Sequence, residues 1–119
     1  MRFPTDLTFK VVAVTPEGRA FDIRDSIPQV RCRTDFAQPE LMQAGDAYKM
    51  CNGPFLPSND FEPGHCTPVE VASSNFSGVE RNLISGGNNA QEVSGRIARN
   101  TERHRPDRPS RVMLPVIAL

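Results

Sequence analysis

The chain has 119 residues, of which 38% are hydrophobic and 24% charged, and its formal net charge at pH 7 is zero. This composition predicts one ordered globular domain and excludes a highly charged disordered chain. Eleven prolines and eight glycines indicate many turns and much loop. No run approaches the roughly 18 apolar residues that span a bilayer, and the first residues do not resemble a signal peptide. We therefore expect a soluble cytoplasmic protein, or one of a virion or host cytoplasm if the chain is viral.

The first predicted strand runs from Leu7 to Val14, where β-branched and aromatic residues dominate. A turn signal, TPEGRA, follows, and then Phe21 and Ile23 alternate with charged residues. The two segments predict a β-hairpin. The alternating residues QVRCR, 29 to 33, predict a third short strand.

A short helix is predicted over Pro39 to Ala44, because proline suits the first helical turn and a glycine follows the last residue. The segment from Ala47 to Cys51 predicts a fourth strand. Four prolines and two glycines lie between Asn52 and Pro68, so this segment is expected to be a long loop. Val69 to Ala72 predicts another short strand.

A longer helix is predicted from Asn89 to Arg103. Asn89 suits the N-cap, and Val93 and Ile97 mark an apolar stripe, although Gly95 weakens a helix by about 1 kcal/mol relative to alanine. The apolar residues Val112 to Leu119 predict a final strand, at a sheet edge because it contains a proline.

These elements predict a β-rich α+β fold, with about five or six short strands in a small antiparallel sheet or partly open barrel and one short and one longer helix. We expect a single domain over residues 1–119. Residues 1–80, the β-rich body, hold seven Lys/Arg against eleven Asp/Glu, whereas residues 81–119, the basic helix and last strand, hold seven against three. The zero net charge therefore conceals an acidic body and a basic last third.

Twelve of the fourteen basic residues are arginine, whose planar fork suits bidentate contact with phosphate or carboxylate. On the predicted helix, three of the arginines would form one row, opposite the apolar stripe. The alternative is a solvated face whose exposed ion pairs contribute about 0–1 kcal/mol each. The candidate partner- or phosphate-binding residues are Arg96, Arg99, Arg103, Arg105, Arg108 and Arg111.

The leading functional hypothesis is a non-enzymatic structural or interaction subunit, of viral or mobile-element origin, that binds a protein partner or itself. Its acidic body would meet the arginine segment of another copy. Its C-terminal strand would add to a neighbouring sheet through Val112, Leu114 and Val116.

The first alternative is a small single-stranded nucleic-acid-binding protein with an OB-like fold. The stretches EGRAFDIRD, 17 to 25, and AGDAYKM, 44 to 50, resemble strands of filamentous-phage single-stranded DNA-binding proteins. Candidate stacking or loop contacts are Tyr48, Lys49, Phe55 and Phe61. A second alternative is a small viral inhibitor of a host enzyme.

Catalytic and metal chemistry find little support in the sequence. Three cysteines and His65 lack the close spacing of a zinc site. Cys51, His65 and Asp60 are the least unfavourable set for nucleophilic catalysis. We expect no catalytic residue, metal, cofactor or small-molecule substrate, and hence no enzyme.

Overall fold

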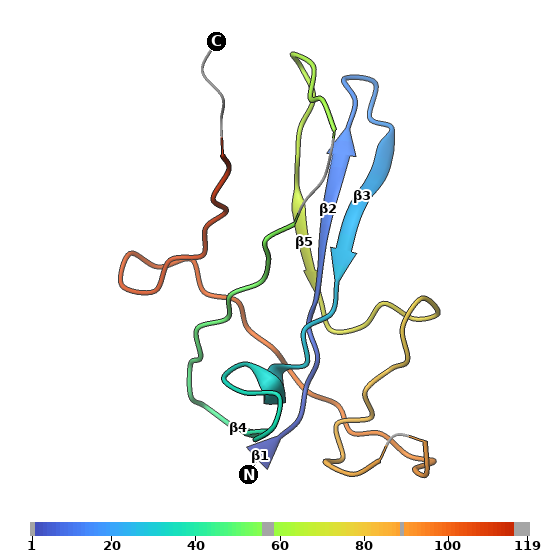
Figure 1. The fold of residues 1–119 in the computed structure, drawn as a ribbon, viewed down its shortest axis with the longest axis vertical. Coiled ribbons are helices and arrows are strands. Elements are labelled where there is room, and N and C mark those ends of the chain that lie inside the picture. Colours follow the sequence, from blue (N-terminus) through green and yellow to red (C-terminus); the bar gives the residue numbers. More distant parts are fainter. Residues whose placement is uncertain (1, 56–58, 89, 116–119) are drawn as a thin grey trace.

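A computed structural model of the protein describes residues 2–55, 59–88 and 90–115. The regular structure in these residues is almost entirely β: a three-stranded sheet, a two-residue strand pair and one short 3-10 helix. Long irregular segments connect them and run beside the sheet (Figure 1). Within the described residues no helix is long and apolar enough to cross a membrane.

A β-hairpin forms the centre of the fold. Strand β2, Thr8–Val14, pairs antiparallel with β3, Ala20–Ser26, with a register shift between Val11 and Val12. Gly18 has φ of 83°, which suits glycine, and the turn is closed by Thr15 N–H donating to Arg19 O at 2.9 Å. The exposed Glu17 carboxylate accepts a hydrogen bond from the Thr15 side chain and a weaker one from its own backbone N–H, and both hold its pKa below the usual value. This hairpin was predicted from the sequence and is confirmed.

Strand β5, Val69–Ala72, pairs antiparallel with the other side of β2, as predicted for a short strand at this position. The order β3-β2-β5 makes β2 the central strand, and the bridge between Val14 and Cys66 extends the pairing. The outer edge of β3 has no strand partner among the described residues.

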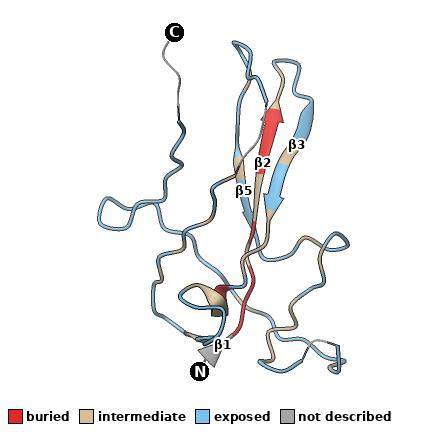
Figure 2. Cartoon of the chain, in the orientation of Figure 1, coloured by how far each residue is buried: buried red, intermediate tan, exposed pale blue. Residues whose placement is uncertain are grey.

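The aliphatic core is small and lies on β2. Among the described residues the buried aliphatic side chains are Val11, Val12 and Ala13 of β2 and Val30. Figure 2 shows burial concentrated in β2 and in the segment leading into it. Val30 begins the 3-10 helix η1, Val30–Cys32, at the base of the sheet.

The segment leading into β2 is held by polar contacts from distant parts of the chain. Thr5 and Asp6 are both buried. Thr5 O accepts from Val30 N–H at 3.3 Å, and Asp6 Oδ2 accepts from Asn82 Nδ2 at 2.9 Å. Asn100 Nδ2 lies 3.4 Å from Thr5 Oγ1. We call Thr5 and Asp6 the polar anchor, because residues near 30, 82 and 100 all meet there.

The molecule is more open than a compact domain of its length. Its radius of gyration is 16.6 Å and its extents are 50 × 34 × 26 Å, whereas about 13.5 Å is typical for this many residues. Its accessible surface is 9639 Å², against roughly 6,400 Å² for a compact monomer of this mass. Surface that a self-sufficient domain would bury is therefore exposed.

The predicted α+β class is wrong, because neither predicted helix is present in the described residues. Asn89 lies outside the described residues, and from residue 90 to 103 the chain is irregular. Arg96 N–H donates to Leu83 O at 2.8 Å, and the Gly95 backbone packs so closely on Leu83 that a Cβ would lie 3.2 Å from its Cδ2. Since Val93 and Ile97 are fully exposed, no packing supports the apolar stripe of a helix.

The short helix predicted over Pro39 to Ala44 is absent for a related reason. Gln43 N–H, which such a helix would direct at the Pro39 carbonyl, donates to the Tyr48 hydroxyl at 2.9 Å instead. Residues Met42–Gln43 instead form strand β4, which pairs with β1, Arg2–Phe3. A contact between segments thus replaces the local helical hydrogen bonds.

Three predicted strands also differ from the structure. Residues 29 to 33 contain η1, and Ala47 to Cys51 is irregular. The final segment is exposed and irregular from Val112 to Pro115, while residues 116–119 lie outside the described residues. In the part of these segments that the structure describes, the one β contact is the isolated bridge between Gln29 and Asp6, and a strand requires a longer pairing than this.

We predict that Asp6→Ala lowers the free energy of unfolding by about 1–3 kcal/mol, because the part-buried Asn82 amide loses its acceptor. Asp6→Asn keeps an acceptor oxygen and should lose less. Urea unfolding of both variants, with Asn82→Ala in a double-mutant cycle, measures the interaction. Equal stability of Asp6→Ala and the parent would show that the polar anchor contributes little.

Candidate functional site

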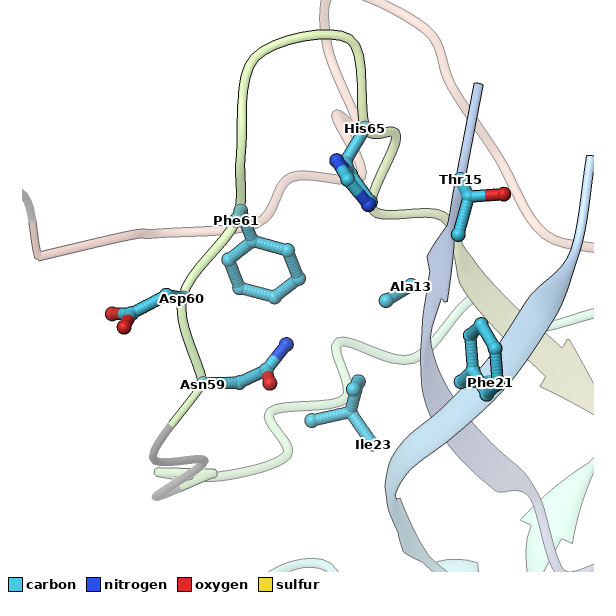
Figure 3. A pocket seen from close by; sticks show the side chains of 8 residues that line it. All are labelled: Ala13, Thr15, Phe21, Ile23, Asn59, Asp60, Phe61 and His65. Atoms are coloured by element: carbon cyan, nitrogen blue, oxygen red, sulfur yellow. The ribbon is translucent and has the colours of Figure 1, made fainter. Parts of the chain in front are cut away.

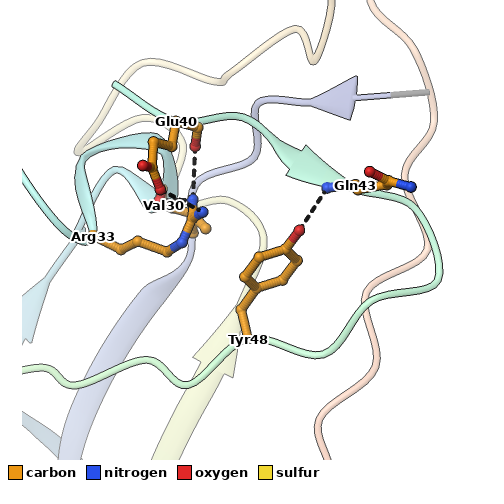
Figure 4. Close-up of polar contacts among 5 residues, drawn as sticks. All are labelled: Val30, Arg33, Glu40, Gln43 and Tyr48. Atoms are coloured by element: carbon orange, nitrogen blue, oxygen red, sulfur yellow. Dashed lines mark hydrogen bonds and ion pairs between the residues drawn. The ribbon is translucent and has the colours of Figure 1, made fainter. Parts of the chain in front are cut away.

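The most highly connected side chain that sequence reasoning missed is Arg33. Its guanidinium donates to Val30 O at 3.2 Å and to Glu40 O at 2.6 Å, and it pairs with Glu40 Oε2 at 3.2 Å. Only 13% of the side chain is exposed. Figure 4 shows these contacts gathered around η1 and the segment before β4. The partners lie up to seven residues away in irregular chain, so no periodic pattern could have indicated them.

Tyr48, a predicted stacking residue, lies in the same cluster. The Arg33 guanidinium carbon is 4.6 Å from its ring centroid. The Tyr48 hydroxyl accepts from Gln43 N–H at 2.9 Å (Figure 4). One face of the ring is therefore occupied within the chain, and the residue fixes β4. Its neighbour Lys49 is exposed.

A shallow recess beside the hairpin contains Phe61, another predicted contact residue. Its volume is about 200 Å³, below the roughly 300–1,000 Å³ of typical ligand pockets. Phe21 and Ile23 of β3 face Phe61 across it (Figure 3). The predicted contact Phe55 is half-buried and is not part of its wall. The lining residues are Ala13, Thr15, Phe21, Ile23, Asn59, Asp60, Phe61 and His65.

The catalytic set considered from the sequence is not assembled. Asp60 and His65 both border the recess, but Figure 3 shows the Asp60 carboxylate pointing away from the imidazole. His65 Nδ1 lies 3.1 Å from Glu62 O. Cys51 is exposed and does not line the recess. In the part of the chain that the structure describes, no group of three or more His, Cys, Asp or Glu could hold a metal ion.

The six candidate arginines lie on an exposed, irregular segment and not on a helix face. Arg105 Nε contacts Asp107 Oδ1 at 3.1 Å. The side chains of the other five have no hydrogen bond or ion pair with the described residues. The structure does not bring them into the recess or the Arg33 cluster.

The candidate assembly residues continue this exposed segment. Val112, Met113 and Leu114 are 59%, 86% and 70% exposed. They form no strand with the described residues, and Val116 lies outside those residues. Three successive apolar side chains are therefore in water, directly after the arginines.

Comparison with known proteins shows which family the chain is similar to. The model of a family described as the X-Pro dipeptidyl-peptidase C-terminal non-catalytic domain matches residues 3–113. The chain is also 40% identical over 115 residues to the cocaine esterase of Rhodococcus sp. (strain MB1 Bresler). The alignment covers 95% of this chain and 20% of that protein, so the chain spans about a fifth of its relative's length.

These matches overturn the functional hypotheses drawn from the sequence. A viral or mobile-element structural subunit, a nucleic-acid-binding protein and a viral inhibitor are all wrong, because the chain is similar to part of peptidases and esterases. The expectation that the chain is not an enzyme is also wrong, because the matches indicate an enzyme-associated protein, although the matching domain is itself described as non-catalytic. The clustering of arginines gave no information about the class of protein that carries them.

We predict that Arg33→Lys lowers the free energy of unfolding by about 1–2 kcal/mol, because an ammonium group cannot reproduce the forked contacts with Val30 and Glu40. Arg24→Lys is the matched control, since the structure gives the exposed Arg24 no side-chain partner among the described residues. Chemical denaturation compares the two variants. Equal effects would contradict a special role for Arg33.

Proposed function

This chain belongs to the family of X-Pro dipeptidyl-peptidase C-terminal non-catalytic domains, and from that membership we propose that it is a single accessory domain of a hydrolase. In this proposal it packs against the catalytic part of the enzyme and stabilises it. The catalytic groups belong to that other part. The chain contributes a surface.

The two comparisons favour one reaction class for the whole enzyme. A dipeptidyl peptidase cleaves an amide bond and an esterase cleaves an ester bond, so both transfer an acyl group to water. We propose that the complete enzyme hydrolyses an ester or an X-Pro peptide bond. The choice between these substrates depends on the catalytic part.

The observation that carries the packing proposal is the amount of surface that the chain leaves in water, together with the large hydrophobic side chains exposed on it. Its accessible surface exceeds that of a compact monomer by roughly 3,200 Å². Permanent interfaces bury about 1,000–2,500 Å² on each partner, so this excess is more than enough surface for a permanent partner to cover. The exposed large hydrophobic residues are Phe21, Phe36, Phe61, Val71, Phe76, Val93, Ile97, Val112, Met113 and Leu114.

The small core also indicates that the chain is stabilised by a partner. Among the described residues the buried aliphatic side chains are three valines and one alanine. Each valine contributes about 1.5–3 kcal/mol and the alanine less, whereas ordering a single residue opposes folding by about 1–2 kcal/mol. A catalytic part that covers the exposed residues would supply the missing burial.

We expect the chain and the catalytic part of its hydrolase, produced as separate polypeptides, to form a 1:1 complex in size-exclusion chromatography with light scattering. Ester- or X-Pro-cleaving activity should be absent from this chain. The catalytic part should melt at a higher temperature in the complex, because binding stabilises the folded state. Full activity and unchanged melting of the catalytic part without this chain, together with no complex, would refute the proposal.

A further inference from the structure

Residues 103–111, here called the arginine hook, form a loop that is closed by its own contacts. Arg105 and Arg108 form an antiparallel bridge, and Arg108 N–H donates to Arg105 O at 3.0 Å. Ser110 Oγ donates to Arg103 O at 2.7 Å and joins the two ends. Pro106 follows Arg105 directly, a position that favours a tight turn. The hook therefore has a defined shape without packing on the sheet.

The hook projects from the molecule and keeps its charge. Figure 1 shows it as the orange loop on the opposite side of the molecule from β3. All nine of its residues are exposed. It carries four arginines and one carboxylate, Asp107, which Arg105 contacts. Arg103, Arg108 and Arg111 have no side-chain partner among the described residues.

The acidic body does not neutralise the hook. The ion pairs of the body, Lys10 with Asp22 and Arg33 with Glu40, are formed between residues of the body itself. His104 lies 3.8 Å from Glu102, which is also local. Among the described residues no carboxylate of residues 1–80 contacts a hook arginine. The positive charge therefore faces outward.

The apolar residues that follow the hook favour a binding surface over a loop that is only solvated. Val112, Met113 and Leu114 are exposed directly beside Arg111. Arginine and methionine are both enriched in protein interfaces, whereas a solvated loop gains nothing from three apolar side chains. A partner for this surface must offer carboxylates for the guanidinium forks and an apolar patch next to them.

We infer that the arginine hook is a docking element for a carboxylate-bearing surface on the catalytic part of the hydrolase. This inference rests on the proposed function and adds the chemistry of one contact to it. The hook is closed before binding, so fewer side-chain and backbone rotations are lost on docking. Attraction between opposite charges makes the association dependent on salt.

The test uses two double variants that remove the same charge. Arg103→Gln with Arg108→Gln removes two hook charges without breaking a hydrogen bond of either side chain. Arg19→Gln with Arg24→Gln is the matched control, since both residues are exposed on the hairpin. Binding to the separately produced catalytic part is measured by biolayer interferometry at several salt concentrations.

The hook variant should bind about 10- to 100-fold more weakly than the parent at low salt, a loss typical of two charge-assisted contacts. Its Kd should also depend less on salt, while the control stays within about 2-fold of the parent. Equal loss in both variants, or none in the hook variant, overturns the inference. If the parent binds and the hook variant does not differ, the proposed function stands; if the parent itself does not bind, both fail.

A cross-link identifies the partner group directly. Arg108→Lys retains the charge and supplies an amine for carbodiimide coupling to a carboxylate in contact with it. In the complex, Lys at this position should link to an Asp or Glu of the catalytic part. Links only to carboxylates of this chain would overturn the inference.

Discussion

The buried polar anchor, Thr5 and Asp6, is the interaction on which the rest of the structure depends. It receives hydrogen bonds from Val30, Asn82 and Asn100, which lie far apart in the sequence. The bonds from Asn82 and Asn100 tie the chain after β5 to the segment that leads into β2. Asp6 Oδ2 accepts a hydrogen bond from Asn82, whereas its Oδ1 has no hydrogen-bond partner. The stability of the fold is therefore sensitive to substitutions here, because losing a partner leaves a buried polar group without a hydrogen bond.

The sheet and the irregular segments have different roles in the proposed accessory domain. The hairpin and β5 provide a frame in which β2 is paired on both sides. The irregular segments carry most of the exposed apolar and cationic side chains. A domain with a small sheet and a large exposed surface buries much of that surface only against a partner. Such a domain suits a non-catalytic role, because catalysis needs reactive groups that are held rigidly in place.

The sequence predicts the parts of the fold that depend on neighbours in the chain. The β2–β3 hairpin follows from alternation and a glycine turn within 19 residues. The prediction of a helix over Asn89 to Arg103 was wrong because a periodic sequence shows the apolar face of a helix but not whether another segment packs on it. Ile97 is exposed, and the Leu83 carbonyl binds the backbone of this segment instead. The Arg33 cluster escaped prediction because irregular chain brings its members together. The arginines were expected to be accessible to a partner and are exposed, but the class of protein that carries them became apparent only from the comparison with known proteins.

The exposed edge of β3 affects whether newly made molecules aggregate before the domain binds its partner. An unpaired strand edge offers N–H and C=O groups to any other extended chain, and uncovered edges promote aggregation. Here Asp22, Arg24 and Asp25 place three charges in seven residues of that strand, and exposed charges of this kind discourage a second copy from adding its own strand. The hairpin thus protects newly made molecules from joining one another edge to edge while their apolar surface is still uncovered.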